Sequence, residues 1–101
     1  MAEMLKRNDT LTHLNLSSND FLREGLISLC EGLTVNKSIT YLDLSRNSFS
    51  NNQNGIGLAE ALKFNHTIKT LNLRGCNFSE LGNPILLTKK KNTTIITQSN
   101  N

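Results

Sequence analysis

One eleven-residue pattern occurs three times in this chain at nearly constant spacing. The copies read LTHLNLSSNDF from Leu11, ITYLDLSRNSF from Ile39 and IKTLNLRGCNF from Ile68, so their starts lie 28 and 29 residues apart. A lead-in that begins with asparagine precedes each copy, and a fourth lead-in at Asn92 places another start at Ile95. A fixed period of this length is the signature of stacked repeats.

The pattern predicts a short strand and a turn at the start of each copy. In the second copy, Leu42 and Leu44 alternate with polar residues, which is typical of a strand with one buried and one solvated face. Asn47 follows at the turn, where a buried amide must both donate to and accept from the backbone. We expect equivalent asparagines to bridge neighbouring turns, and Phe49 to return to the core.

The rest of each copy predicts a helix. An apolar face at helical spacing recurs in the first two copies, at Ile27, Leu29, Cys30 and Leu33 and again at Ile56, Leu58, Ala59 and Leu62. In the third copy, Asn83 and Pro84 predict the first turn of a helix, and Lys89 to Lys91 its C-terminal end. Stacked units of strand, turn and helix would bury all the apolar stripes and pair the strands in parallel.

These features together resemble the leucine-rich repeat, L-x-x-L-x-L-x-x-N/C-x-L/F. The full helix in each copy, as in GLAEALKFNHTIKTLNL over residues 57–73, resembles the ribonuclease-inhibitor-like subclass found in NOD-like receptors, Ran GTPase-activating proteins and bacterial effectors. Cys76 stands at the turn asparagine position, a replacement that the family tolerates. The resemblance implies a right-handed α/β solenoid with a short parallel sheet on the concave side and helices on the convex side.

A chain of 101 residues is long enough for one domain at most. We expect a single leucine-rich repeat domain over residues 1–101, with repeats at 11–38, 39–67 and 68–94. Residues 1–10 match the tail of a preceding repeat, because Leu5 aligns with Leu33 and Leu62. Residues 95–101 are expected to form a degraded repeat and a polar tail, since Gln98 and Asn100 stand where leucines should follow.

Composition argues against several kinds of partner. The net charge of +3 gives no basic face for nucleic acid, and no apolar run approaches the ~18 residues of a membrane span. The N-terminal segment MAEMLKRNDT lacks the apolar core of a signal peptide. Cys30 and Cys76 fit neither a disulfide framework nor a zinc site and are expected to be buried, reduced and unreactive. We therefore predict a cytoplasmic protein without a cofactor or metal.

Strand alternation predicts which side chains face outward from the sheet. Solenoids of this kind usually bind with the concave strand side. The expected partner-binding residues form three columns, with one residue just beyond them: His13, Tyr41 and Thr70; Asn15, Asp43 and Asn72; Ser17, Ser45 and Arg74; and Arg46. Tyr41 and Arg74 are the expected anchors, because tyrosine and arginine are enriched in binding hot spots. The alternative is a solvated polar face.

The sequence favours a protein-protein interaction module over an enzyme. His13, Asp43 and a nearby serine suggest a catalytic triad, but an open strand face lacks the pocket and the oxyanion donors for that chemistry. Two alternatives are a regulator of a small GTPase, acting through Arg46 and Arg74, and a C-terminal capping segment of a larger receptor or effector. We also expect weak self-association through the exposed edge of the first strand, residues 12–17.

Overall fold

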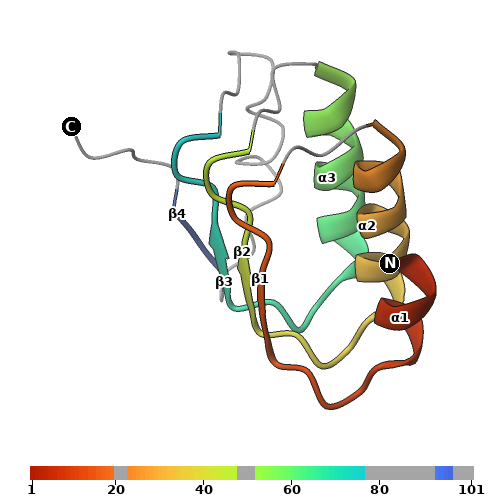
Figure 1. Ribbon diagram of the computed structural model, residues 1–101. Helices are drawn as coiled ribbons and strands as arrows, with labels where there is room; N and C mark the ends of the chain where they lie inside the picture. The colour runs from red at the N-terminus through yellow and green to blue at the C-terminus, as the bar shows by residue number, and fades with distance from the viewer. Residues whose placement is uncertain (20–22, 48–51, 77–92, 97–101) are drawn as a thin grey trace.

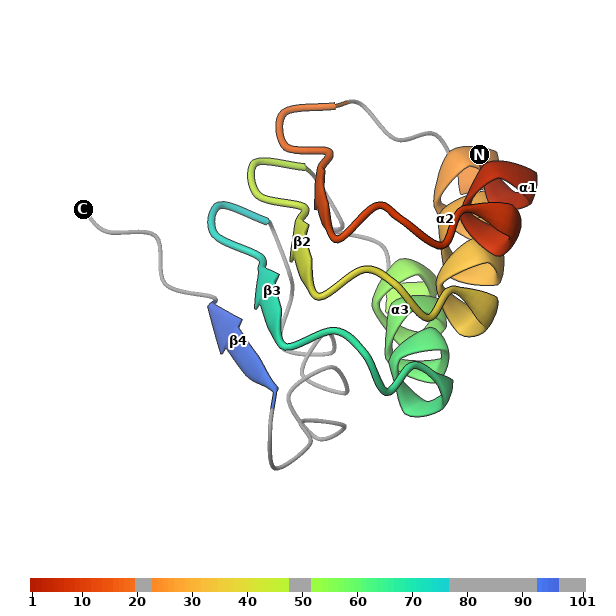
Figure 2. The same cartoon turned by 90° about the horizontal axis from the view of Figure 1, so that it is seen from below.

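The chain folds into successive strand–helix coils that form two layers. The computed structural model describes residues 1–19, 23–47, 52–76 and 93–96. Its elements, in chain order, are α1 (Ala2–Arg7), β1 (His13–Asn15), α2 (Arg23–Val35), β2 (Tyr41–Asp43), α3 (Asn52–Phe64), β3 (Thr70–Asn72) and β4 (Thr94–Ile96). The strands form one layer and the helices the other (Figure 1), and the view from below shows the same separation (Figure 2).

The four strands form one parallel sheet in the order β1-β2-β3-β4. Leu14 lies opposite Leu42, Leu42 opposite Leu71, and Leu71 opposite Ile95. Each strand has only three residues, because the chain turns away as soon as its inward leucine is placed. The alignment of these apolar residues confirms the predicted α/β solenoid with a shared apolar spine.

Between the sheet and the helices lies one continuous apolar core. Its buried members are Leu5, Leu26, Leu29, Leu33, Ile39, Leu42, Leu44, Leu58, Ala59, Ala61, Leu62, Ile68, Leu71 and Leu73. Helix α2 packs between α1 and α3. Gly32 of α2 allows close contact with Leu5 of α1. A Cβ added at Gly32 would lie only 2.6 Å from Cβ of Leu5, which is too close for a larger residue. None of the described helices is both long and apolar enough to cross a bilayer.

The first coil is less buried than the sequence predicts. Leu11, Leu14 and Leu16 pack against the core but remain partly exposed. Ile27, expected on the apolar face of α2, is 50% exposed, so that expectation was wrong. The three leucines are partly exposed because β1 is an edge strand and no described coil covers its outer side. Helix α2 buries Leu26, Leu29 and Leu33 instead, so Ile27 lies outside its buried face.

Asparagines in the lead-ins join one coil to the next. Asn36 and Asn65 are only 3% and 5% exposed. Asn36 Nδ2 donates to the carbonyl oxygens of Leu5 (2.9 Å) and Asn8 (3.1 Å) in the preceding coil. Asn36 Oδ1 accepts the backbone N–H groups of Ser38 and Ile39 at 2.9 and 2.8 Å. Each amide therefore satisfies backbone groups in two coils at once.

A second series of bonds follows the turns after the strands. Asn47 Nδ2 donates to the carbonyls of Leu16 and Leu44, both at 2.9 Å, while Asn47 Oδ1 accepts the N–H of Asn19 at 2.9 Å. In the third copy Cys76 Sγ replaces this donor and reaches the Leu44 carbonyl at 3.0 Å. The predicted bridging of neighbouring turns is confirmed.

Both series begin with a residue whose inter-coil bonds are incomplete. Asn8 Oδ1 accepts the N–H groups of Thr10 and Leu11, as its equivalents do, but Asn8 Nδ2 has no partner among the described residues. Asn19 Nδ2 donates only to carbonyls of its own turn. The sequence suggested a buried asparagine there, yet Asn19 is exposed, because its turn follows β1 at the edge of the sheet.

Several expectations fall on residues outside those described. They concern Phe49, the helix start at Asn83 and Pro84, the lysines Lys89 to Lys91, the side chain of Ile56, and Gln98 and Asn100. A fourth strand is present as β4, in parallel register with β3, but not where the fourth lead-in predicts it. That lead-in gives Ile95 the position of Ile68, whereas Ile95 lies opposite Leu71, so the predicted register was wrong by three residues.

Asn36→Ala should lower the free energy of unfolding by about 2–4 kcal/mol, because it removes the bonds to two carbonyls of the preceding coil and to two N–H groups of its own coil. Asn8→Ala is the matched control. It removes the same local bonds but no inter-coil bond, so it should cost only about 1 kcal/mol. Urea unfolding followed by circular dichroism measures both. Equal losses in the two variants would contradict the role given to the inter-coil bonds.

Candidate partner-binding face

The outward side of the sheet begins with an aromatic pair. His13 on β1 lies opposite Tyr41 on β2, and their rings stack with centroids 5.5 Å apart and planes inclined by 22°. His13 Nδ1 also lies 3.0 Å from the hydroxyl of Thr12. Thr70 on β3 completes this column next to Tyr41. The stack holds the Tyr41 ring against its neighbour rather than leaving it free in solvent.

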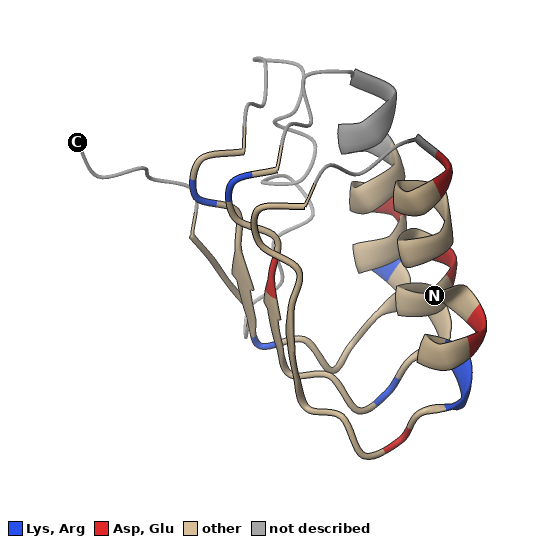
Figure 3. Cartoon of the chain, in the orientation of Figure 1, with Lys and Arg blue, Asp and Glu red and all other residues tan. Residues whose placement is uncertain are grey.

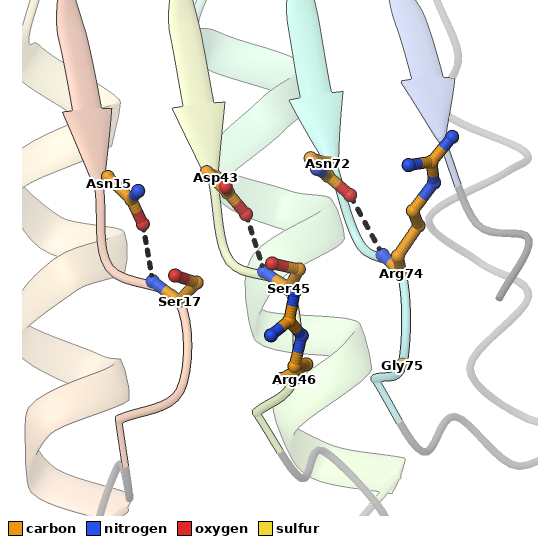
Figure 4. A pocket seen from close by; sticks show the side chains of 8 residues that line it. All are labelled: Asn15, Ser17, Asp43, Ser45, Arg46, Asn72, Arg74 and Gly75. Atoms are coloured by element: carbon orange, nitrogen blue, oxygen red, sulfur yellow. Dashed lines mark hydrogen bonds between the residues drawn. The ribbon is translucent and has the colours of Figure 1, made fainter.

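The second column fixes the backbone where the strands end. Asn15, Asp43 and Asn72 lie side by side in register. In each repeat the side-chain Oδ1 accepts the backbone N–H two residues further on, at 2.9 Å for Ser17, 2.9 Å for Ser45 and 3.0 Å for Arg74 (Figure 4). Such Asx turns hold the local backbone without tertiary help.

A groove of about 450 Å³ lies at this end of the sheet. Its lining residues come from three successive repeats: Asn15, Ser17, Asp43, Ser45, Arg46, Asn72, Arg74 and Gly75 (Figure 4). Ser45 is only 5% exposed, so it forms part of the groove floor. The sequence predicted an open face without a pocket, whereas the turns beyond the strands hollow this face.

Those turns share an uncommon backbone conformation. Ser18, Arg46 and Gly75 occupy equivalent positions with φ of 57°, 57° and 68°. The Arg46 N–H donates to the Arg74 carbonyl at 2.7 Å, and the Ser18 N–H donates to the Ser45 carbonyl at 2.9 Å. A Cβ added at Gly75 would lie 3.4 Å from Cγ of Arg46, an ordinary van der Waals distance, so glycine suits this position because of its positive φ and not because of space.

Charge is distributed differently over the two layers (Figure 3). On the helices, Glu3 lies 3.9 Å from Lys6 and 3.7 Å from Arg7, and Glu60 lies 3.1 Å from Lys63. Arg46 and Arg74, by contrast, form no ion pair with any described residue, and both are exposed. The groove therefore presents two available guanidinium groups beside one carboxylate.

The described hydrogen bonds do not assemble a triad. His13 contacts Thr12 and Tyr41, while the side-chain bond of Asp43 is to the backbone of Ser45. Within the described ranges, no three His, Cys, Asp or Glu side chains gather as they would to hold a metal ion.

Both cysteines are free thiols. The sequence predicted that they are buried, but both are only half-buried. Burial, reinforced by the neighbouring Glu31 carboxylate, raises the pKa of Cys30 to about 11. Burial also raises the pKa of Cys76, against the opposing effect of backbone hydrogen bonds from Asn47 and Arg46. Since the thiolate is the nucleophile, these environments disfavour reaction at neutral pH.

Comparison with known proteins settles the family. The leucine-rich repeat family model matches residues 7–30, 35–52 and 64–82, which together make up more than half of the chain. The chain belongs to the leucine-rich repeat family. The resemblance seen in the sequence is thereby confirmed, and the observed sheet and helices are those that such repeats form.

The relatives are large proteins that contain such repeats. Mouse NACHT, LRR and PYD domains-containing protein 4E is 34% identical over 86 residues, 85% of this chain and 9% of the relative. Human NACHT, LRR and PYD domains-containing protein 13 is 43% identical over 75 residues, 72% of this chain and 7% of the relative. Human leucine-rich repeat-containing protein 34 is 36% identical over 50 residues, 50% of this chain and 11% of the relative. The chain thus spans about a tenth of their length, and its similarity is to repeats of the type found in NOD-like receptors.

The predicted site residues divide into two neighbouring groups. The groove brings together Asn15, Ser17, Asp43, Ser45, Arg46, Asn72 and Arg74. His13, Tyr41 and Thr70 lie on the same strands but do not line it. The structure adds Gly75, which follows Arg74 and aligns with Arg46. The sequence could have indicated Gly75, because the equivalent turn position is Ser18 in the first repeat and Arg46 in the second.

Alkylation by iodoacetamide should be slow at both cysteines of the native chain. With a pKa of about 11, roughly one Cys30 thiol in a thousand is ionised at pH 8, and this fraction rises about tenfold per pH unit until the pKa is approached. Mass spectrometry at timed intervals measures the rate. The same chain in urea is the control and should react quickly. Equal rates in the native and unfolded chains would contradict the effect of burial.

Proposed function

We propose that the chain is a protein-interaction module that binds a partner protein through its strand face. The proposal includes a right-handed coil with this face on the concave side and the helices on the convex side. The family supports it, because solenoids of this architecture offer extended binding surfaces. It also includes the cytoplasmic location expected from the sequence.

One observation carries the proposal. Strand register aligns outward residues of successive repeats, so that His13, Tyr41 and Thr70 form one row and Asn15, Asp43 and Asn72 the next. Neighbouring strands lie ~4.8 Å apart, which makes the rows a continuous surface. Tyr41 supplies an aromatic ring already held by stacking, so little side-chain entropy remains to be lost when a partner binds.

Tyr41→Ala should reduce partner capture at least about fivefold, as expected for truncation of a tyrosine hot spot. The measurement is capture by the immobilised chain from an extract of its source cells, quantified by mass spectrometry. Phe64→Ala is the matched control, because Phe64 is an aromatic residue on the helix layer with 63% of its surface exposed. Capture that is lost equally in both variants, or in neither, would contradict binding through the strand face.

A second proposal is that the chain serves as one part of a longer solenoid. The incomplete bonds of Asn8 and Asn19 support it, together with the partial exposure of Leu11, Leu14 and Leu16. One repeat further on, the equivalent amides donate to a preceding coil. The first coil therefore has donors and apolar side chains positioned for another coil of the same kind.

A second copy of residues 1–28 joined directly before Met1 tests this idea in register, because Leu5 and Asn8 of the copy would fall where the amide of the original Asn8 can reach their carbonyls. The added coil should raise the free energy of unfolding by about 2–4 kcal/mol through new burial and hydrogen bonds. The control extension carries Leu14→Asp and Leu16→Asp within the copy. If the two extended chains unfold at the same urea concentration, the proposal is wrong.

A further inference from the structure

We propose that the groove between the turns recognises a carboxylate side chain on an acidic segment of the partner, held by Arg46 and Arg74. This inference rests on the proposed function, since it names the chemistry of the partner at the same face. Both arginine side chains run from their turns back towards the strands (Figure 4). They belong to adjacent repeats whose backbones are joined by the bond from the Arg46 N–H to the Arg74 carbonyl.

The lining of the groove excludes an apolar occupant. Apart from Gly75, each lining residue carries a hydroxyl, amide, carboxylate or guanidinium group. An apolar side chain placed there would desolvate these groups without giving them hydrogen bonds. A carboxylate can instead accept paired N–H groups from a guanidinium fork, which is among the strongest side-chain hydrogen bonds.

The charges of the groove locate the carboxylate more closely. Two guanidinium groups outnumber the single carboxylate of Asp43, so the groove is positive overall. Asp43 holds one oxygen towards the Ser45 N–H and would repel a second carboxylate brought next to it. The bound carboxylate therefore lies away from Asp43, against the guanidinium groups of Arg46 and Arg74. A hydrogen-bond donor on the same acidic segment of the partner binds the Asp43 carboxylate.

The backbone at Arg46 supports a role for its side chain. A residue with a Cβ in the left-handed region costs about 1–2 kcal/mol, which glycine avoids. Gly75 occupies the equivalent position in the next repeat, whereas Arg46 has φ of 57°. Ser18 shares this conformation, so it belongs to the turn itself. Arg46 is distinguished by placing a long charged side chain there, next to Gly75 of the following repeat.

The extent of positive charge favours an acidic peptide over nucleic acid. Affinity for a nucleic-acid backbone comes from several cations spaced along many phosphates. The groove has two arginines and includes a carboxylate among its walls. Charge complementarity over this short span matches one acidic side chain of an extended peptide.

The test is a titration of the full chain with an acetylated, amidated hexaglutamate peptide, followed by nuclear magnetic resonance. Saturable shifts are expected at the Nε–H groups of Arg46 and Arg74 and at the Gly75 amide. Arg46→Gly and Arg74→Gln should each weaken the affinity at least about fivefold, as for loss of a charge-assisted bond. Arg7→Gln is the matched control, because it removes the same charge from the helix layer and should leave affinity within about twofold.

The same variants distinguish an effect on stability from an effect on peptide binding. Arg46→Gly relieves the left-handed strain, so it should raise the urea midpoint while it weakens peptide binding. Equal loss of affinity in Arg7→Gln, or tighter binding of a phosphoserine peptide that lacks glutamate, would overturn the assignment to a carboxylate. Partner capture that depends on Tyr41 but not on Arg46 or Arg74 would overturn this inference alone. Peptide binding that persists when capture is insensitive to Tyr41 would instead count against the proposed function.

Discussion

The structure depends on one recurring interaction, an asparagine amide that joins the backbone of two coils. A coil of this size ends its strand and its helix in the interior, where unpaired N–H and C=O groups are costly. Asn36 and Asn65 solve this at the lead-ins by donating to the preceding coil and accepting from their own. Because each bond spans one repeat, it also sets the register in which the next coil stacks.

That register connects the core to the proposed binding face. The alignment of Leu42 with Leu71 inside the sheet is also the alignment of Tyr41 with Thr70 and of Asp43 with Asn72 outside it. A change in the stacking of one coil would therefore misalign the apolar spine and the polar rows together. The same geometry leaves the ion pairs of the described residues on the helices, while Arg46 and Arg74 pair with no described residue.

Much of the candidate site could be predicted from the repeat. Alternation within a strand shows which side chains point outward, and the period shows which of them are neighbours. The groove could not be predicted, because its shape depends on how far each turn rises beyond the strand. The burial of Ser45 and the stacking of His13 on Tyr41 likewise arise from packing between repeats. Neither is visible in the spacing of one copy.

The sequence by itself determined the family, the parallel order of the strands and the identity of the inward leucines, because a strict period leaves a repeating chain few other ways to bury its apolar residues. Only the tertiary structure decided that Ile27 is exposed, that Asn8 and Asn19 begin their series with incomplete bonds, and that the Arg46 side chain lies beside Gly75. These features depend on what each residue meets in the neighbouring coil. A local pattern carries no information about a neighbour that lies a full repeat away.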